Sequence, residues 1–182
     1  MAIARHPDQR VGIFIDTQNL YHGGKNLHRA RVNFANIVKD AVAGRRLVWA
    51  VAYAITTETG EEKGFLEALE KQGIETKSKD LQIFYGGAKK ADWDVGIAVD
   101  AIRLAPKLDV VVLVSGDGDF VPLVQFLKSS VQCEVIAFGK NTSAKLKEEA
   151  DSYLDLSEDQ DRYLIKMRRQ GRRNEEEQEN EE

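Results

Sequence analysis

Four aspartates stand where predicted secondary-structure elements begin or end. Asp16 ends the apolar run VGIFID, and Asp94 lies in the first turn of a predicted helix. Asp117 and Asp119 follow the run DVVVLVSG in the segment SGDGDF. In open parallel α/β sheets, ligands bind beyond the carboxyl ends of the strands, where the strand order reverses. The strand-end acids therefore meet in one crevice if their two strands are neighbours.

Carboxylates gathered in one crevice favour a divalent cation. Carboxylates within a few ångströms of one another raise each other's pKa, and a bound cation removes that cost. Hard oxygen ligands suit Mg²⁺ or Mn²⁺, with water and substrate phosphate filling the remaining positions. Gly116 and Gly118 allow the loop to bend closely around an ion.

Each acid also has a purely structural explanation. Asp119 can cap a helix, Asp94 can complement a helix dipole, and Asp16 can be a turn residue. Asp92 is either a peripheral ligand or a cap. Asp100 is either a partner behind the ligands or an outward charge, because it does not share a helical face with Asp94. The convergence of several acids favours the metal site over these single explanations.

Composition excludes several classes of protein. The 182 residues suffice for one well-cored domain plus a tail, and 42% hydrophobic with 31% charged residues is typical of a globular protein. No apolar run approaches the roughly 18 residues of a membrane span. The N-terminus lacks the apolar region of a secretory signal, and Cys133 is a single cysteine, expected as a buried strand thiol. We therefore expect a cytoplasmic protein. The net charge of −4 does not by itself indicate a nucleic-acid binder.

Strand and helix patterns alternate along the chain, which predicts a doubly wound parallel sheet of the α/β class. Predicted strands cover residues 11–16, 46–55, 74–79, 81–85, 109–116, 133–138 and 153–156. Predicted helices cover residues 34–42, 60–73, 92–104, 120–130, 142–150 and 161–170. In the helix over 92–104, one stripe holds Val95, Ala98, Val99 and Ile102.

Three segments resemble the NYN domain of the LabA-like group, within the PIN-like nuclease superfamily. They are IFIDTQNLY (13–21), KADWDVGIAVDAI (90–102) and LVSGDGDFVPLV (113–124). The resemblance covers residues 10–157 and implies a Rossmann-like three-layer α/β/α sandwich with a mainly parallel sheet. A C-terminal helix over 158–170 and a disordered acidic tail over 171–182 are expected to follow.

The resemblance also implies a metal-dependent ribonuclease site. Its metal-binding and catalytic acids are expected to be Asp16, Asp94, Asp117 and Asp119. Asn19 matches a polar residue that orients a ligand or water, and Ser115 matches a small hydroxyl residue ahead of the acid pair. In one departure from the family pattern, Ala91 replaces the glycine that often follows the lysine at position 90. A water activated by Mg²⁺ or Mn²⁺ would hydrolyse an RNA phosphodiester, with no side-chain nucleophile.

An acidic nuclease crevice needs nearby cations to admit RNA. Lys89 and Lys90 precede Asp94 and are the preferred cations; together with Asn19 and Ser115 they are the expected substrate-positioning residues. Other residues are candidates for a rim of cations that contacts phosphates or for a surface on which bases stack. Each of them has an alternative explanation as an ordinary surface or core residue. They are Lys25, His28, Arg29, Arg31, Lys140, Tyr21, His22, Tyr85 and Trp93.

Other functions fit the same pattern less fully. A non-catalytic RNA-binding or regulatory protein of this fold is the main alternative. A haloacid-dehalogenase-type phosphatase needs a second aspartate two positions after Asp16, where Gln18 stands, and a receiver-like domain likewise needs clustered acids near the first strand. Tyr163, Leu164 and Met167 are expected to pack either on the body or on a second copy in a homo-oligomer.

Overall fold

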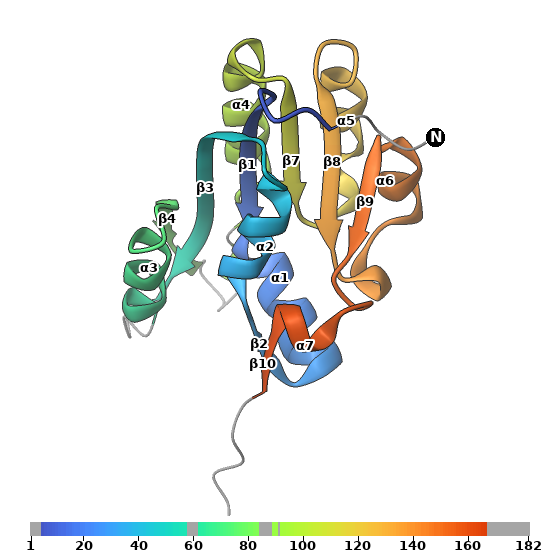
Figure 1. Ribbon diagram of the computed structural model, residues 1–182. Helices are drawn as coiled ribbons and strands as arrows, with labels where there is room; N and C mark the ends of the chain where they lie inside the picture. Colours follow the sequence, from blue (N-terminus) through green and yellow to red (C-terminus); the bar gives the residue numbers. More distant parts are fainter. Residues whose placement is uncertain (1–4, 58–61, 84–88, 91, 167–182) are drawn as a thin grey trace, which may run out of the picture.

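The computed structural model describes residues 5–57, 62–83, 89–90 and 92–166, with the backbone alone described at 82–83 and 89–90. Ten strands and seven α-helices make up most of this part of the chain (Figure 1). The strands are β1 (Arg10–Asp16), β2 (Ala30–Val32), β3 (Arg46–Thr56), β4 (Glu75–Asp80), β5 (Gln82–Ile83), β6 (Lys89–Lys90), β7 (Val110–Val114), β8 (Gln132–Ala137), β9 (Ser152–Asp155) and β10 (Leu164–Lys166). The α-helices are α1 (Thr17–His22), α2 (Phe34–Val42), α3 (Lys63–Glu70), α4 (Asp94–Leu104), α5 (Val121–Leu127), α6 (Ala144–Glu149) and α7 (Gln160–Tyr163). The other helical turns are η1 (Gly23–Leu27), η2 (Ala105–Lys107), η3 (Gly118–Phe120) and η4 (Gly139–Asn141).

Six parallel strands form the central sheet in the order β4-β3-β1-β7-β8-β9. The chain builds outward from β1 in one direction through β3 and β4, and in the other through β7, β8 and β9. The strand order therefore reverses between β1 and β7, which pair directly from Val11 with Val110 to Ile15 with Val114. Both strands are apolar on both faces because both faces of the sheet are covered.

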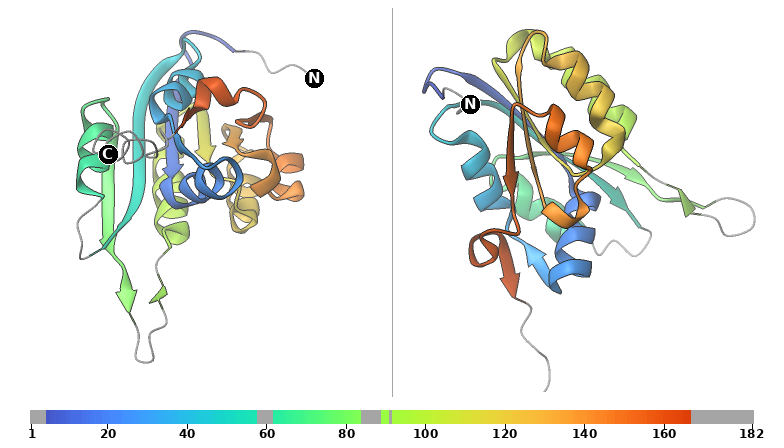
Figure 2. Two further views of the ribbon diagram at one scale, coloured as in Figure 1. Left: turned by 90° about the horizontal axis from the view of Figure 1, so that it is seen from below. Right: turned by 90° about the vertical axis from the view of Figure 1, so that its right-hand side faces the viewer.

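Helices cover the sheet on both faces and make three layers (Figures 1 and 2). One buried cluster joins the sheet to α1, α2 and α3 through residues such as Leu20, Ile37 and Leu69. The other joins it to α4, α5 and α6 through residues such as Ile97 and Leu146. The prediction of a three-layer α/β sandwich with a mainly parallel sheet is confirmed.

The segment after β1 is more regular than the sequence suggests. It continues into α1 and η1, although it contains Gly23 and Gly24. A Cβ added at Gly23 would lie 2.5 Å from the Phe138 ring, and one at Gly24 would lie 2.8 Å from the Val32 side chain. Both glycines therefore allow close packing and do not form a turn. Because glycine has a low helix propensity, the sequence does not predict a helix here.

The C-terminal segment corrects a prediction. A single helix over 158–170 is expected, but the described part is the four-residue helix α7 followed by β10, which pairs antiparallel with β2. Asp40 of α2 accepts hydrogen bonds from Arg162 and from the Tyr163 hydroxyl. These contacts, together with burial of Tyr163 and Leu164 against the body, end the helix after one turn. Met167, residues 167–170 and the acidic tail lie outside the described residues.

The apolar stripe predicted on α4 faces away from the sheet. Val95, Val99 and Ile102 are exposed, and Ile97 and Leu104 are buried instead. Ala98 lies between, half-buried against the core. The helix is apolar on both sides, so periodicity alone does not select the inner one.

Cys133 is the buried strand thiol that the sequence predicts. Its side chain is buried in β8, and this burial, followed by the charge of Asp151, raises the thiol pKa to about 12.

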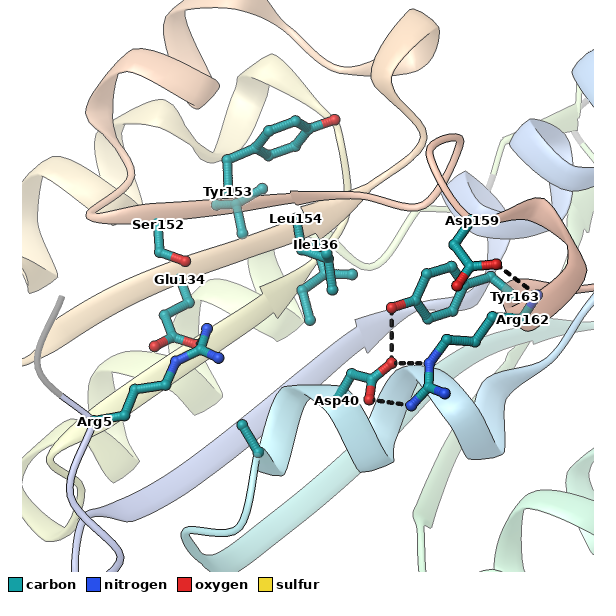
Figure 3. Close-up of a pocket in the computed structure, with 12 residues that line it drawn as sticks. Arg5, Asp40, Glu134, Ile136, Ser152, Tyr153, Leu154, Asp159, Arg162 and Tyr163 are labelled. Carbon is teal, nitrogen blue, oxygen red and sulfur yellow. Dashed lines mark hydrogen bonds and ion pairs between the residues drawn. The ribbon is translucent and has the colours of Figure 1, made fainter. Parts of the chain in front are cut away.

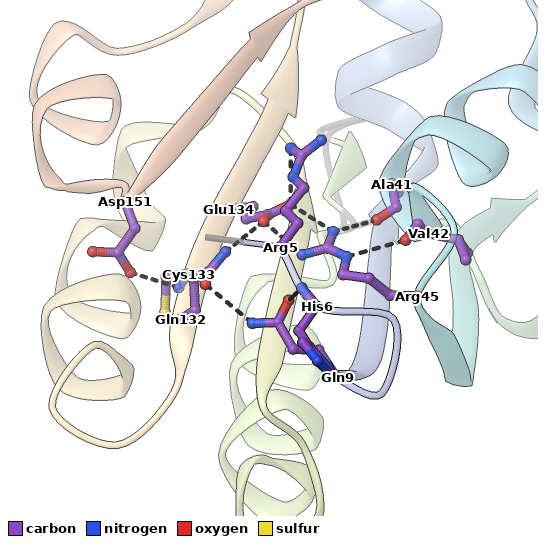
Figure 4. A network of polar contacts seen from close by, with 10 residues as sticks. All are labelled: Arg5, His6, Gln9, Ala41, Val42, Arg45, Gln132, Cys133, Glu134 and Asp151. Carbon is purple, nitrogen blue, oxygen red and sulfur yellow. Dashed lines mark hydrogen bonds and ion pairs between the residues drawn. The ribbon is translucent and has the colours of Figure 1, made fainter. Parts of the chain in front are cut away.

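A buried ion pair holds α2 to the sheet. Arg45, three residues after the end of α2, donates two hydrogen bonds to the Glu134 carboxylate of β8, at 2.7 and 2.9 Å, and both side chains are almost completely buried (Figure 4). The same guanidinium donates to the carbonyl oxygens of Ala41 and Val42 at the end of α2. Gln132 donates a further hydrogen bond to Glu134.

The substitution Glu134→Gln should lower the free energy of unfolding by roughly 3–5 kcal/mol, because it leaves the buried Arg45 charge without a counter-charge. Denaturant unfolding measures the loss. The matched control is Asp161→Asn, whose pair with Lys166 is exposed, and it should change stability by no more than about 0.5 kcal/mol. A loss below about 1 kcal/mol at Glu134 would contradict this account of the pair.

Candidate active site

The candidate site lies at the carboxyl ends of β1 and β7, where the strand order reverses. Asp16 is the last residue of β1 and also the N-cap of α1, and its Oδ1 accepts a hydrogen bond from the Asn19 amide at 3.1 Å. Its Oδ2 accepts one from the Ser115 hydroxyl at 3.1 Å. The carboxylate is thereby fixed between two neighbouring strand ends.

Ser115 and Asn19 tie these two ends together. The fully buried Ser115 hydroxyl also accepts a hydrogen bond from the Asp117 amide at 3.2 Å. The Asn19 side-chain oxygen accepts one from the Gly116 amide at 2.9 Å. The two polar residues predicted to orient groups in the site therefore orient the acid-bearing loops directly.

The SGDGDF loop places its two acids differently. Asp117 is half-buried and caps η3, accepting a hydrogen bond from the Asp119 amide at 3.0 Å, while Asp119 is exposed. A Cβ added at Gly116 would lie 2.7 Å from the Asn141 carbonyl oxygen. This glycine permits the loop to lie against the turn after β8, so its structural role is close approach of two backbones.

Asp94 reaches the site from the first turn of α4. The preceding Trp93 fixes that end of the helix: its indole N–H donates to the Ala54 carbonyl oxygen at 2.8 Å, and its ring packs 5.3 Å from that of Tyr53. Gly96 accommodates the same ring, because a Cβ there would lie 2.5 Å from it. Trp93 is thus mainly a packing residue.

The electrostatics of the four acids are coupled. Burial raises the pKa of Asp94 to about 6, helped by the negative charges of Asp117, Asp16, Asp92 and Asp119. Burial also raises the pKa of Asp16, and the charge of Asp117 adds to this against the hydrogen bonds from Asn19 and Ser115. The predicted acids therefore lie close enough to repel one another, which is the condition that a cation relieves.

The chemistry of these donors fits a hard divalent cation, because all of them are carboxylate oxygens. Their arrangement is looser than a finished coordination sphere: within the described ranges, no three His, Cys, Asp or Glu side chains are grouped closely enough to hold a metal ion. The residues that would hold one are Asp16, Asp94 and Asp117, with Asp119 at the exposed side.

Asp100 is part of a separate polar network beneath α4. Its buried carboxylate accepts hydrogen bonds from the Tyr53 hydroxyl at 2.8 Å, Lys77 at 2.6 Å and Arg103 at 2.9 Å. Burial alone would raise the pKa of Asp100, but the hydrogen bonds from Lys77 and Tyr53 outweigh it and lower the pKa. Asp100 is therefore a structural partner that joins α4 to β3 and β4, and its pairing with Lys77 leaves no signal in the sequence.

The expected cationic rim is seen only in part. The side chains of Lys89 and Lys90, and all of Tyr85, lie outside the described residues. Lys25 donates to the Tyr21 hydroxyl at 3.2 Å, and Lys140 is exposed in η4. Lys79 belongs to no motif in the sequence, yet its ammonium lies 4.7 Å from the centre of the Trp93 ring.

A hollow of about 490 Å³ lies elsewhere, between β8, β9, α2 and α7 (Figure 3). Asp40, Arg162 and Tyr163 form its polar wall, and Ile136 and Leu154 are among its apolar residues. None of the four candidate acids lines it. The candidate site is thus separate from this hollow.

Residues 10–157 match the NYN domain family, and the chain belongs to that family. NYN domains are a PIN-like nuclease family, typically dependent on a metal ion. The chain is 26% identical over 162 residues to the low amplitude and bright protein LabA of Synechococcus elongatus, covering 82% of this chain and 84% of that protein. It is also similar to the crystal structure of VPA0982, a protein of unknown function from Vibrio parahaemolyticus, with a TM-score of 0.80 and 31% identity over 90% of this chain and 100% of the other. The predicted LabA-like NYN membership is confirmed.

No helix among the described residues is both long and apolar enough to cross a lipid bilayer.

The raised pKa of Asp94 predicts a pH-dependent gain in stability for Asp94→Asn. An ordinary aspartate has a pKa of 3.8, and the folded value is about 6, so Asp94 costs the folded protein stability as the pH rises through this interval. In the presence of a chelator, the variant should melt higher than the parent at pH 8, and the difference should vanish below about pH 4. Melting temperatures across this range, with Asp161→Asn as the control, measure the effect. An equal difference at all pH values would contradict the coupling.

Proposed function

We propose that this protein is a metal-dependent ribonuclease that hydrolyses RNA phosphodiester bonds through Asp16, Asp94, Asp117 and Asp119. The observation that carries the proposal is the convergence of these acids at the strand-order reversal, where burial and the charges of neighbouring acids raise the pKa of Asp16 and of Asp94. Membership of a PIN-like nuclease family supports the reaction class and an interaction with RNA. We place the activity in the cytoplasm.

The chain's own residues divide the work in this proposal. Asp16, Asp94 and Asp117 would hold Mg²⁺ or Mn²⁺. When bound, such an ion supplies activation of water for in-line attack and offsets charge on the leaving oxygen. Ser115 holds Asp16 and the Asp117 amide in register, and Asn19 holds the Gly116 amide.

The entrance to the site must tolerate a polyanion beside four acids. Lys89 and Lys90 remain our proposal for positioning the RNA backbone from the segment ahead of α4. Lys79 on the neighbouring β4 is a described cation beside Trp93, and thus beside the start of α4 that carries Asp94. Cations in such positions attract phosphates without reading the base sequence.

Cleavage of labelled single-stranded and structured RNAs tests the proposal. The purified chain should cut RNA with Mn²⁺ or Mg²⁺ and not with a chelator. Asp117→Asn should reduce the rate by more than the roughly 10–100-fold that typically follows loss of a residue supporting a metal ligand. Asp161→Asn, an exposed acid far along the chain, should cleave at the parent rate. Cleavage that survives in Asp117→Asn would point to another centre or to a contaminant.

A non-catalytic RNA-binding or regulatory protein of the same fold is the second candidate. It is favoured by one observation, the lack of a tight three-ligand group among the described side chains. In that case the ion would bind weakly and the acids would not be needed for the biological effect.

Thermal shifts with Mn²⁺ separate the two candidates. An ion that binds the folded state stabilises it by about 2.7 kcal/mol at a hundredfold excess over its Kd. The nuclease proposal expects a saturable rise in melting temperature at millimolar Mn²⁺ that Asp16→Asn and Asp117→Asn abolish and Asp161→Asn keeps. An unchanged melting temperature, together with intact RNA, would favour the second candidate.

A further inference from the structure

Helix α4 is apolar on both of its sides. Ile97, Ala101 and Leu104 face the sheet and are buried. On the outer side, the exposed fractions of Val95 and Val99 are 74% and 56%. A helix that is apolar all round is normally buried all round, yet no described element covers this outer side.

The neighbouring helix α5 extends the same apolar surface. Gln125 and Lys128 of α5 both contact Glu149 of α6. At 100° per residue Phe126 lies on the opposite flank, which faces α4, and its side chain is 61% exposed. We define the α4 patch as the exposed apolar residues Val95, Val99, Ile102 and Phe126.

We propose that the α4 patch is the interface of a homodimer, in which the α4 helices of two copies pack antiparallel across a two-fold axis near Val99. A contiguous exposed apolar patch marks an interaction site, and a two-fold dimer buries one patch against itself. On this axis Val99 meets the same residue of the second copy. Val95 then faces Ile102 of the partner subunit.

The charges at the two ends of α4 favour a second copy in this orientation. Asp92 lies beside the start of the helix, and Arg103 and Lys107 lie at its end. Antiparallel packing brings the acidic start of one α4, beside Asp92, toward the basic end of the partner's α4, whereas parallel packing would bring like charges together. Opposed helix dipoles favour the same orientation.

The size of the patch sets the expected strength. Standard interfaces bury roughly 800 Å² on each partner, and four side chains with their charged flank supply less. We therefore expect a Kd in the micromolar range. Phe126 adds apolar area to the interface from the neighbouring helix α5.

Sedimentation equilibrium of the full chain, from about 5 to 200 μM, tests the proposal. The mass should rise toward twice 20.4 kDa. Val99→Glu sets two carboxylates against each other on the axis and should weaken the Kd roughly 30-fold or more. Because Val99 is exposed in the single chain, the variant should keep the parent melting temperature at low concentration. The control Ile165→Glu, at a 51% exposed apolar residue of β10, should dimerise like the parent.

Cross-linking tests the orientation. Val99→Cys should link to itself through a short bismaleimide, because the two-fold axis brings the two positions together. Ile165→Cys should not link, and the buried Cys133 gives no background. A chain that stays monomeric throughout would overturn the proposal, as would a dimer that survives Val99→Glu and fails to cross-link at Val99. Neither outcome touches the proposed nuclease, which is assayed by RNA cleavage.

Discussion

The constraint on which the site depends is the mutual repulsion of carboxylates that the fold brings together. Asp16 ends β1, Asp117 lies in the loop that follows the neighbouring strand β7, and Asp94 enters from the first turn of α4. Without a bound cation, burial and these charges weaken the folded state, which is visible in the raised pKa of Asp94 and of Asp16. Other interactions must therefore hold the acids in place against this repulsion. Here Ser115 and Asn19 link the two acid-bearing segments with hydrogen bonds.

The position of α4 is fixed in a similar way, by side-chain contacts to the sheet. Its first residue carries a site acid, so its position relative to the sheet decides whether that acid reaches the others. Trp93 fixes the start of the helix to β3, and Asp100 fixes its middle to Tyr53 and Lys77. Asp100 and the site acids therefore differ in environment: three donors lower the pKa of Asp100, whereas burial and the charges of nearby acids raise the pKa of Asp94.

Sequence reasoning reaches the fold and the gathering of the acids because both follow from strong local signals. Strongly apolar strands followed at once by acids mark the carboxyl edge of a parallel sheet, and the strand order then brings those acids together at one crevice. It fails where tertiary contacts decide: Gly23 allows a helix to continue against Phe138, and Asp40 stops the C-terminal helix by binding Arg162 and Tyr163. The sequence also predicts an apolar stripe on α4 but not which side of the helix faces the sheet, because both sides are apolar. Long-range pairs such as Arg45 with Glu134 leave no local pattern at all.

The single cysteine has a consequence for how this molecule responds to its surroundings. Cys133 is withdrawn into β8 and keeps its proton at neutral pH, so the thiolate that oxidants and electrophiles attack is absent from the native state. Reaction of that sulfur with a thiol reagent therefore measures how often the packing around β8 opens, because the closed fold buries it between the sheet and its covering helices.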